Sequence, residues 1–339
     1  MKYNFLGNTG LKVSELCLGT MTFGGGGGIW SSIGNLAQQE VDSLIKTSVD
    51  AGINFIDTAN VYSSGLSEQL TGQSIRNLGI NRNDLVIATK VRGKMGEGPN
   101  HIGLTRKHIL EQAEESMKRL QVDFIDLYQI HGFDALTPLE ETLYALEYLV
   151  QSGKVRYIGC SNLAAWQLMK ALGISELKGY SKFVSLQAYY TIAGRDLERE
   201  LVPLLKDQKI GLMVWSPLAG GFLSGKYKRN SETEEGSRRT TFDFPPINKE
   251  KAYNIIDVMD EIATTKNISV AQVALAWLLH QPVVSTVIIG AKKPGQLDDN
   301  LKAIDVKLDG NDLKKLDDIS KLTPEYPGWM IERQGGERK

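Results

Sequence analysis

Two short apolar segments, FIDLYQIH (124–131) and VRYIGC (155–160), flank the stretch LEETLYALEYLVQSG (139–153). The two outer segments are rich in Ile, Leu and Val, which is typical of strands buried on both faces of a parallel sheet. The middle stretch repeats its apolar residues with the period of a helix and ends at a glycine. Together they predict a strand, a crossover helix and a second, parallel strand.

This unit recurs along the chain. Further apolar segments of the same kind are LCLGT (16–20), FIDTA (55–59), LVIATKV (85–91), FVSLQAYY (183–190), GLMVWS (211–216) and VSTVIIG (284–290). Amphipathic helical stretches lie between them, for example QEVDSLIKTSVDAG (39–52) and TRKHILEQAEESMKRL (105–120). Eight strands, each followed by a helix, predict an α/β fold of the (β/α)8 type, a TIM barrel.

Both ends of the chain add elements to this barrel. KYNFLG (2–7) and LKVSEL (11–16), on either side of an Asn-Thr-Gly turn, predict an N-terminal β-hairpin on the barrel floor. KAYNIIDVMDEIATTK (251–266) and AQVALAWLLHQ (271–281) predict extra helices near the C-terminus. We expect a single domain over 1–339 with a C-terminal tail, 323–339, whose aromatic residues line either the pocket or an oligomer interface. The polar stretch 228–243 predicts a long surface loop.

An open, doubly wound sheet is the alternative fold. It would need the dinucleotide-binding pattern G-x-G-x-x-G after the first strand. The candidate stretch GTMTFGGGGGIW (19–30) has five successive glycines but places Ile29, Trp30 or Ser31 where the third glycine of the pattern belongs. A flexible loop at the barrel mouth accounts better for these glycines.

Composition narrows the class of protein. Of the 339 residues 42% are hydrophobic, and the net charge of −1 gives no electrostatic reason to expect nucleic acid or a membrane as a partner. Cys17 and Cys160 lie in apolar segments and are expected to be buried free thiols, and the four histidines lack metal-ligand spacing. Without a signal peptide or a run of about 18 apolar residues, we expect a cytoplasmic protein.

Four polar side chains follow neighbouring predicted strands. Asp57, Lys90 and His131 stand at the carboxyl ends of the second, third and fourth strands, and Tyr62 lies in the loop after the second. The active sites of such barrels lie at these ends, and adjacent strands are only about 4.8 Å apart, so the four side chains can converge.

This set suits proton donation to a carbonyl oxygen. A lysine ammonium about 4 Å from a phenol, at an effective dielectric near 20, favours the phenolate by about 4 kcal/mol. That corresponds to roughly three pKa units before desolvation opposes it, so Lys90 could make Tyr62 a working acid. Asp57 would keep Lys90 charged, and His131 would bind the substrate oxygen.

The stretch AGGFLSGKYK (219–228) resembles a phosphate-binding loop. Gly220, Gly225 and Lys226 fit G-x-x-x-x-G-K, but Tyr227 stands where a nucleotide triphosphatase needs Ser or Thr for its magnesium ion. The pattern is compatible with a phosphate bound without magnesium or with an ordinary glycine-rich turn.

Several separate motifs, in order, resemble the aldo-keto reductase family, in its bacterial-type, potassium-channel β-subunit-like branch. They are LGNTGLKVSELCLGTMTFG (6–24), DTANVYSSGLSE (57–68), ATK (88–90), YQIH (128–131) and IIGAKKPGQLDDN (288–300). The resemblance implies a (β/α)8 reductase that uses a nicotinamide cofactor and no metal. It also implies that Asp57, Tyr62, Lys90 and His131 form a catalytic tetrad with Tyr62 as general acid.

The same resemblance implies where the cofactor binds. Ser161, Asn162 and Gln187 match positions that bind the nicotinamide carboxamide, and Trp215 matches an aromatic residue that stacks on the ring. The segment from Ser216 to Lys226 matches the one that covers the pyrophosphate. The other implied contact residues are Thr20, Met21, Pro217, Leu218, Gly220, Gly225, Gly290, Lys292, Gln296, Asp299 and Asn300.

Lys292 and the neighbouring Lys293 match contacts to the adenosine 2′-phosphate, and Asp299 and Asn300 match contacts to adenine. NADPH is therefore favoured over NADH, although Gln296 stands where many members of the family have an arginine.

The predicted function is the NADPH-dependent, reversible reduction of a small-molecule aldehyde or ketone. A Schiff-base aldolase acting through Lys90 is an alternative from the residues alone. A non-enzymatic, redox-sensing subunit that binds NADPH is a second alternative. The sequence does not indicate an oligomeric state.

Overall fold

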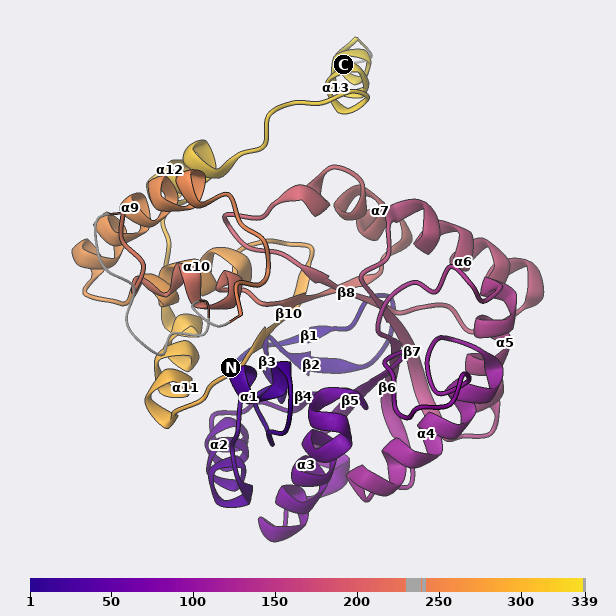
Figure 1. The fold of residues 1–339 in the computed structure, drawn as a ribbon. Coiled ribbons are helices and arrows are strands. Elements are labelled where there is room, and N and C mark those ends of the chain that lie inside the picture. The colour runs from indigo at the N-terminus through magenta and orange to yellow at the C-terminus, as the bar shows by residue number, and fades with distance from the viewer. Residues whose placement is uncertain (230–238, 240–241, 338–339) are drawn as a thin grey trace.

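Eight parallel strands form a closed barrel in the computed structural model, which describes residues 1–229, 239 and 242–337 (Figure 1). The order around the barrel is β10-β3-β4-β5-β6-β7-β8-β9, and every neighbouring pair is parallel. The predicted (β/α)8 fold is thus confirmed. The strands are β3 Leu16–Gly19, β4 Phe55–Asp57, β5 Val86–Val91, β6 Ile125–Ile130, β7 Val155–Ser161, β8 Ser185–Tyr189, β9 Gly211–Trp215 and β10 Val284–Ile289.

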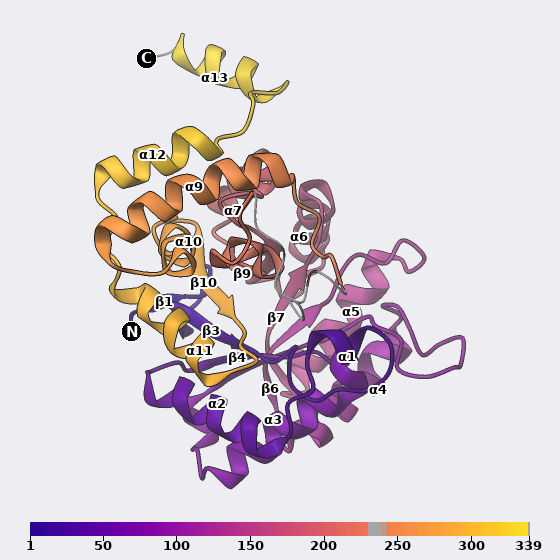
Figure 2. The ribbon, with the colours of Figure 1, turned by 60° about the vertical axis from the view of Figure 1, so that its left-hand side comes forward.

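Helices surround the barrel and connect successive strands (Figure 2). The α-helices are α1 Ile29–Ile33, α2 Gln38–Asp50, α3 Leu66–Asn77, α4 Arg106–Leu120, α5 Leu139–Gln151, α6 Ala165–Lys178, α7 Leu201–Gln208, α9 Lys249–Lys266, α10 Val270–Leu279, α11 Pro294–Leu301, α12 Gly310–Ser320 and α13 Gly328–Gly336. The 3-10 helices are η1 Tyr62–Gly65, η2 Arg82–Asp84, η3 Asp196–Glu198, η4 Ala219–Ser224 and η5 Lys302–Asp305. The extra helices predicted before the last strand are α9 and α10. The short helix α1, directly after the glycine run, was not predicted.

The strands are mostly apolar because both of their faces are covered. All six residues of β5 are buried, for example. A small apolar cluster inside the barrel includes Cys17, Phe55 and Met213, and a larger one fills the space between the strands and the helices. Cys17 and Cys160 are buried free thiols, as predicted.

The N-terminal hairpin is present and lies on the barrel floor. Strand β1 Tyr3–Phe5 pairs antiparallel with β2 Lys12–Ser14. The Asn4 side chain donates a hydrogen bond of 2.9 Å to the Ser285 carbonyl, and the Asn54 side chain accepts one of 2.7 Å from the Ser14 amide. Because Asn54 and Ser285 lie at the amino-terminal ends of β4 and β10, the opposite, carboxyl-terminal end of the barrel is left open for a site.

The C-terminal tail extends away from the barrel, and α13 lies apart from the other helices in both views (Figures 1 and 2). Tyr326 and Trp329 are exposed, and the two roles expected for the tail stay predictions. Most of the predicted loop 228–243 lies outside the described residues. Among the described residues, no single helix has the length and apolar composition to cross a membrane; the bent pair α9 and α10 meets those two criteria only in combination.

Candidate active site

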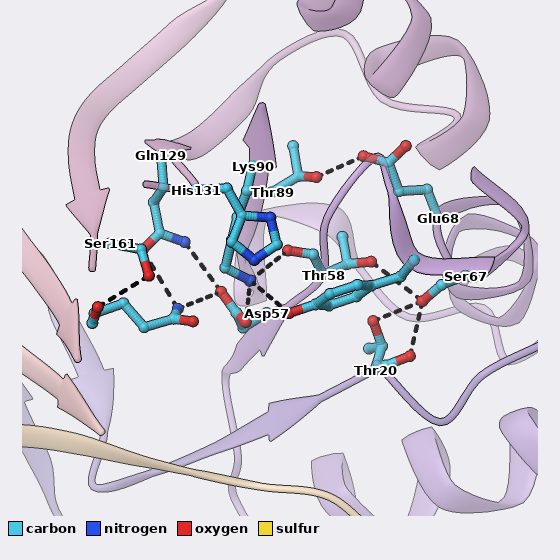
Figure 3. Close-up of polar contacts among 12 residues, drawn as sticks. Thr20, Asp57, Thr58, Ser67, Glu68, Thr89, Lys90, Gln129, His131 and Ser161 are labelled. Atoms are coloured by element: carbon cyan, nitrogen blue, oxygen red, sulfur yellow. Dashed lines mark hydrogen bonds and ion pairs between the residues drawn. The ribbon is translucent and has the colours of Figure 1, made fainter. Parts of the chain in front are cut away.

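Asp57, Lys90 and His131 converge at the carboxyl-terminal end of the barrel (Figure 3). Tyr62 joins them, with its hydroxyl 3.3 Å from Lys90 Nζ. Asp57 is the last residue of β4, Lys90 is the fifth of β5, and His131 directly follows β6. Tyr62 begins η1 in the loop after β4. The sequence therefore placed all four correctly on the fold.

Lys90 is the centre of the cluster and is fully buried. Its Nζ atom donates to Asp57 Oδ2 at 2.6 Å, to the Thr58 carbonyl at 2.8 Å and to the Tyr62 hydroxyl oxygen at 3.3 Å. An ammonium group has three N–H donors, and these three contacts use all of them. Burial lowers the pKa of Lys90, but Asp57 and Tyr62 together raise it above its ordinary value. Lys90 is thus a cation at neutral pH.

Asp57 is held by two amide side chains as well as by Lys90. Its Oδ1 atom accepts a hydrogen bond of 3.0 Å from Gln129 Nε2 and one of 2.9 Å from Gln187 Nε2. Gln129 was not among the predicted site residues. Its position gave a signal, since it is a polar residue two places before His131 on a buried strand and so faces the barrel interior.

His131 lies against Tyr62, with ring centroids 5.8 Å apart in an edge-to-face arrangement. Burial, followed by the positive charges of Lys90 and Arg92, lowers the pKa of His131 to about 3. The imidazole is therefore neutral at physiological pH and can donate one hydrogen bond without carrying a charge.

The backbone after Tyr62 is unusual. Ser63, Ser64 and Gly65 have φ values of 48°, 55° and 94°, three successive left-handed residues that lead into α3. Only the glycine adopts this conformation without cost, and such strained residues concentrate at functional sites. The turn brings Tyr62 back over the barrel, where 9% of it is exposed and accessible to a substrate.

Helix α3 is fixed to the barrel by buried polar contacts that the sequence did not reveal. Ser67 Oγ donates to the Thr20 carbonyl at 2.8 Å, and Glu68 accepts from Thr89 Oγ1 and from Arg119 Nε. Thr20 itself is fully buried, and its hydroxyl lies 2.8 Å from Ser67 Oγ, so in this structure it supports α3. Its predicted contact with a cofactor stays a prediction.

The residues predicted to bind nicotinamide lie beside the tetrad. Ser161 Oγ donates to the Gln187 carbonyl at 2.9 Å, so these two residues are linked to each other and, through Gln187, to Asp57. Asn162 Nδ2 donates to the His131 carbonyl at 3.2 Å, and its Oδ1 accepts from Trp215 Nε1 at 3.0 Å. Hydrogen bonds through Asn162 thus link His131, which lies beside Tyr62, to Trp215 at the end of β9.

The Trp215 ring is the next part of this surface. It is stacked on Phe244 with centroids 5.9 Å apart and an interplanar angle of 9°. Phe244 is held near it because Arg239 donates to the carbonyls of Ala219 and Pro245. Phe244 was not predicted as a site residue, and only its position in the fold reveals it.

The glycine-rich segment after Trp215 is a tight turn built on η4. Positive φ values occur at Ser216, Ala219, Gly220, Gly221 and Gly225, from 49° to 93°. A Cβ atom added to Gly221 would meet no atom within 4 Å, so this glycine faces open space. Pro217, Leu218 and Lys226 belong to the same segment. Partly exposed glycine backbone at Gly221, in the same segment as Lys226, fits an anionic ligand such as a phosphate.

The residues predicted to bind the adenosine end lie in α11 and in the segment just before it. The Lys292 amide donates to Gln296 Oε1 at 2.9 Å, and Lys292 Nζ donates to the Ser32 carbonyl at 2.9 Å. Asp299 accepts from Ser269 Oγ and Gln272 Nε2, both at 2.7 Å. Three further residues were predicted to contact the cofactor. They are Gly290, which follows β10, Asn300 in α11, and Met21, which follows Thr20. None of these predicted cofactor contacts is tested by the structure.

Two further side chains at the mouth of the barrel were not predicted from the sequence as site residues. The Trp30 ring lies 5.9 Å from that of Tyr62, edge to face, and Arg92 follows Lys90 by two residues at the end of β5. Among the described residues, no group of three or more His, Cys, Asp or Glu side chains is placed to hold a metal ion.

Comparison with known proteins agrees with this arrangement. The model of the aldo/keto reductase family matches residues 15–321. The chain is 38% identical to the uncharacterized oxidoreductase YrpG of Bacillus subtilis, over 97% of this chain and 100% of the relative. It is 37% identical to a probable voltage-gated potassium channel subunit beta of Arabidopsis thaliana, over 96% of this chain and 99% of that one.

A third relative is the versiconal hemiacetal acetate reductase of Aspergillus parasiticus. It is 36% identical, and the match covers 97% of this chain and 99% of the relative. Family model and relatives extend over nearly the whole barrel, including the strand ends that carry Asp57, Lys90 and His131. The chain therefore belongs to the aldo/keto reductase family and is an oxidoreductase.

Proposed function

We propose that the protein reduces an aldehyde or ketone to an alcohol with NADPH as cofactor, in a reversible reaction. The observation that carries this proposal is the contact of 3.3 Å between Lys90 Nζ and the Tyr62 hydroxyl, in a site where Lys90 is also paired with the buried Asp57. The bound nicotinamide would supply a hydride to the carbonyl carbon. Tyr62 would supply the proton to the carbonyl oxygen.

The energy of this contact is large enough for the role. Two unit charges 3.3 Å apart attract by about 5 kcal/mol at an effective dielectric near 20. Loss of the phenol proton creates such a pair, so Lys90 favours the phenolate of Tyr62. Tyr62 can then give up its proton to the substrate oxygen and regain it in the reverse reaction.

His131 has a complementary task. As a neutral imidazole it can donate a hydrogen bond to the carbonyl oxygen beside Tyr62, which polarises the carbonyl without competing as an acid. Asp57 keeps Lys90 oriented, and Gln129 and Gln187 keep Asp57 in place.

The proposed cofactor site runs from Ser161, Asn162 and Gln187 over Trp215 to the glycine-rich segment ending at Lys226. Lys292 would contact the 2′-phosphate and so favour NADPH over NADH. These assignments rest on the family motifs, and the stacked ring on Trp215 and the open backbone at Gly221 support them.

A Schiff-base aldolase is less well supported. Its nucleophile must be a neutral and accessible amine. Lys90 is fully buried, is charged and uses all three of its donors. A redox-sensing subunit is a better second candidate, because two relatives are named as probable potassium channel subunits beta. We expect a small-molecule carbonyl compound as partner and the cytoplasm as location.

The test is NADPH oxidation with a panel of neutral aldehydes and ketones. The wild type should turn over several of them, whereas Tyr62→Phe should lose at least a hundredfold in kcat and keep its affinity for NADPH. Tyr148→Phe, which removes an exposed phenol on α5, is the matched control and should behave as wild type. Normal turnover by Tyr62→Phe would remove the acid role. Slow cofactor exchange without turnover in the wild type would favour the redox-sensing subunit.

A further inference from the structure

Arg92 stands at the mouth of the site with a backbone conformation that disfavours any side chain. Its φ angle is 148°, a value that glycine adopts freely and other residues rarely do. Strand β5 pairs with β6 at Val91 and Ile130, so Arg92 lies beside His131 just past the ends of the two strands. A large cation kept in a position that suits glycine indicates a role for the side chain.

The structure also orients this side chain. Arg92 Nε donates to the Phe133 carbonyl at 2.9 Å, and a Cβ atom added to Gly132 would lie 3.6 Å from Arg92 Cδ. The stem thus passes over the backbone that follows His131. Its positive charge reaches that residue, because Arg92 is one of the groups that lower the pKa of His131.

The charged end of Arg92 remains available. Although the residue is exposed, its guanidinium forms no ion pair and its Nη atoms donate no hydrogen bond to any residue that the structure describes. Asp134 is the nearby acid whose pKa Arg92 helps to lower, but its carboxylate already accepts from the Leu104 and Leu136 amides and the Thr137 hydroxyl. A planar guanidinium whose two Nη atoms are both free is suited to bind a carboxylate end-on with two parallel hydrogen bonds.

We propose that Arg92 selects carbonyl substrates that carry a carboxylate, by binding this group while the carbonyl lies at Tyr62 and His131. This inference rests on the proposed reductase function, which it refines by naming a substrate class. Arg92 acts on binding and takes no part in the proton or hydride transfer.

The experiment compares two aldehydes that differ only in charge, 4-carboxybenzaldehyde and methyl 4-formylbenzoate, with NADPH and the full chain. The measured quantity is the ratio of kcat/KM for the acid to kcat/KM for the ester. In Arg92→Met this ratio should fall on the order of ten- to hundredfold, the usual effect of a lost hydrogen bond to a charged group. Arg92→Lys should keep part of it.

Two variants control for folding and for general charge. Arg92→Gly should fold without strain, since glycine accepts the φ angle of 148°, and should lose the same ratio as Arg92→Met. Lys94→Met removes a cation two residues away that is paired with Glu97, and should keep the wild-type ratio.

Each outcome tests either the role of Arg92 or the proposed reductase function. A ratio within about twofold of wild type in both Arg92→Met and Arg92→Gly would overturn the role of Arg92, and so would equal losses for acid and ester. Failure of the wild type to reduce the acid, while it reduces neutral carbonyls, would also overturn it and leave the reductase proposal intact. If no carbonyl in either panel is reduced, the proposed function itself is wrong.

Discussion

Removing the charge of Lys90 tests stability and chemistry separately. Lys90→Met keeps most of the side-chain volume but leaves Asp57 buried without its cation, 2.6 Å from where Nζ was. Breaking a buried ion pair in this way costs about 3 to 5 kcal/mol of the free energy of unfolding. In Asp57→Asn/Lys90→Met both charges are gone, and the Asn side-chain oxygen can still accept from Gln129 and Gln187.

The double variant should therefore be more stable than the sum of the single losses implies, with a coupling energy of about 2 kcal/mol or more. Activity should not recover, because the phenolate of Tyr62 has lost an interaction of about 5 kcal/mol with the ammonium group at 3.3 Å. We expect kcat to fall at least a hundredfold in both Lys90→Met and the double variant.

Urea unfolding of the wild type, both single variants and the double variant gives the coupling energy, and NADPH oxidation gives kcat. Additive stability losses would show that the contact between Lys90 and Asp57 does not hold the site together. Recovery of activity along with stability in the double variant would refute the role of Lys90 in making Tyr62 acidic.

Two other predictions concern pH and the cofactor. The free energy of unfolding should decrease as the pH falls from about 6.5 towards 3. In this range His131 takes up a proton in the unfolded chain but stays neutral in the folded protein, where its pKa is about 3. Urea unfolding at pH 7 and at pH 4.5 should therefore give a smaller difference in the free energy of unfolding for His131→Asn than for wild type. Lys292→Ala should weaken NADPH binding much more than NADH binding in a direct titration, and equal losses would place the 2′-phosphate elsewhere.

The strands and the tetrad could be predicted because both follow local patterns. Apolar runs of the right length define the strands, and three of the four candidate catalytic side chains stand directly at the ends of those runs. Lys90 and His131, for example, are the polar residues with which ATK and YQIH end. The barrel brings these strand ends together, whereas the position of Tyr62 depends on the loop after β4.

The missing site residues depend on contacts between distant parts of the chain. Arg239 positions Phe244 on Trp215 by binding the Ala219 and Pro245 carbonyls, and no sequence period encodes such a contact. Trp30 reaches Tyr62 from α1, a five-residue helix too short to leave a periodic pattern. Arg92 looks like a surface residue in the sequence, and only its φ angle singles it out.

Strand β5 holds both partners of the contact between Lys90 and Tyr62. Lys90 belongs to β5, and the preceding residue, Thr89, donates a hydrogen bond to Glu68 in the first turn of α3. Glu68 is fully buried and also pairs with Arg119 of α4. A shift of α3 would therefore break the hydrogen bond to β5 or the ion pair to α4. Since the left-handed turn before α3 carries Tyr62, the same strand that supplies the ammonium group also fixes the phenol. An active site built this way is oriented before any substrate arrives, which is the condition under which fixed charges stabilise a transition state most strongly.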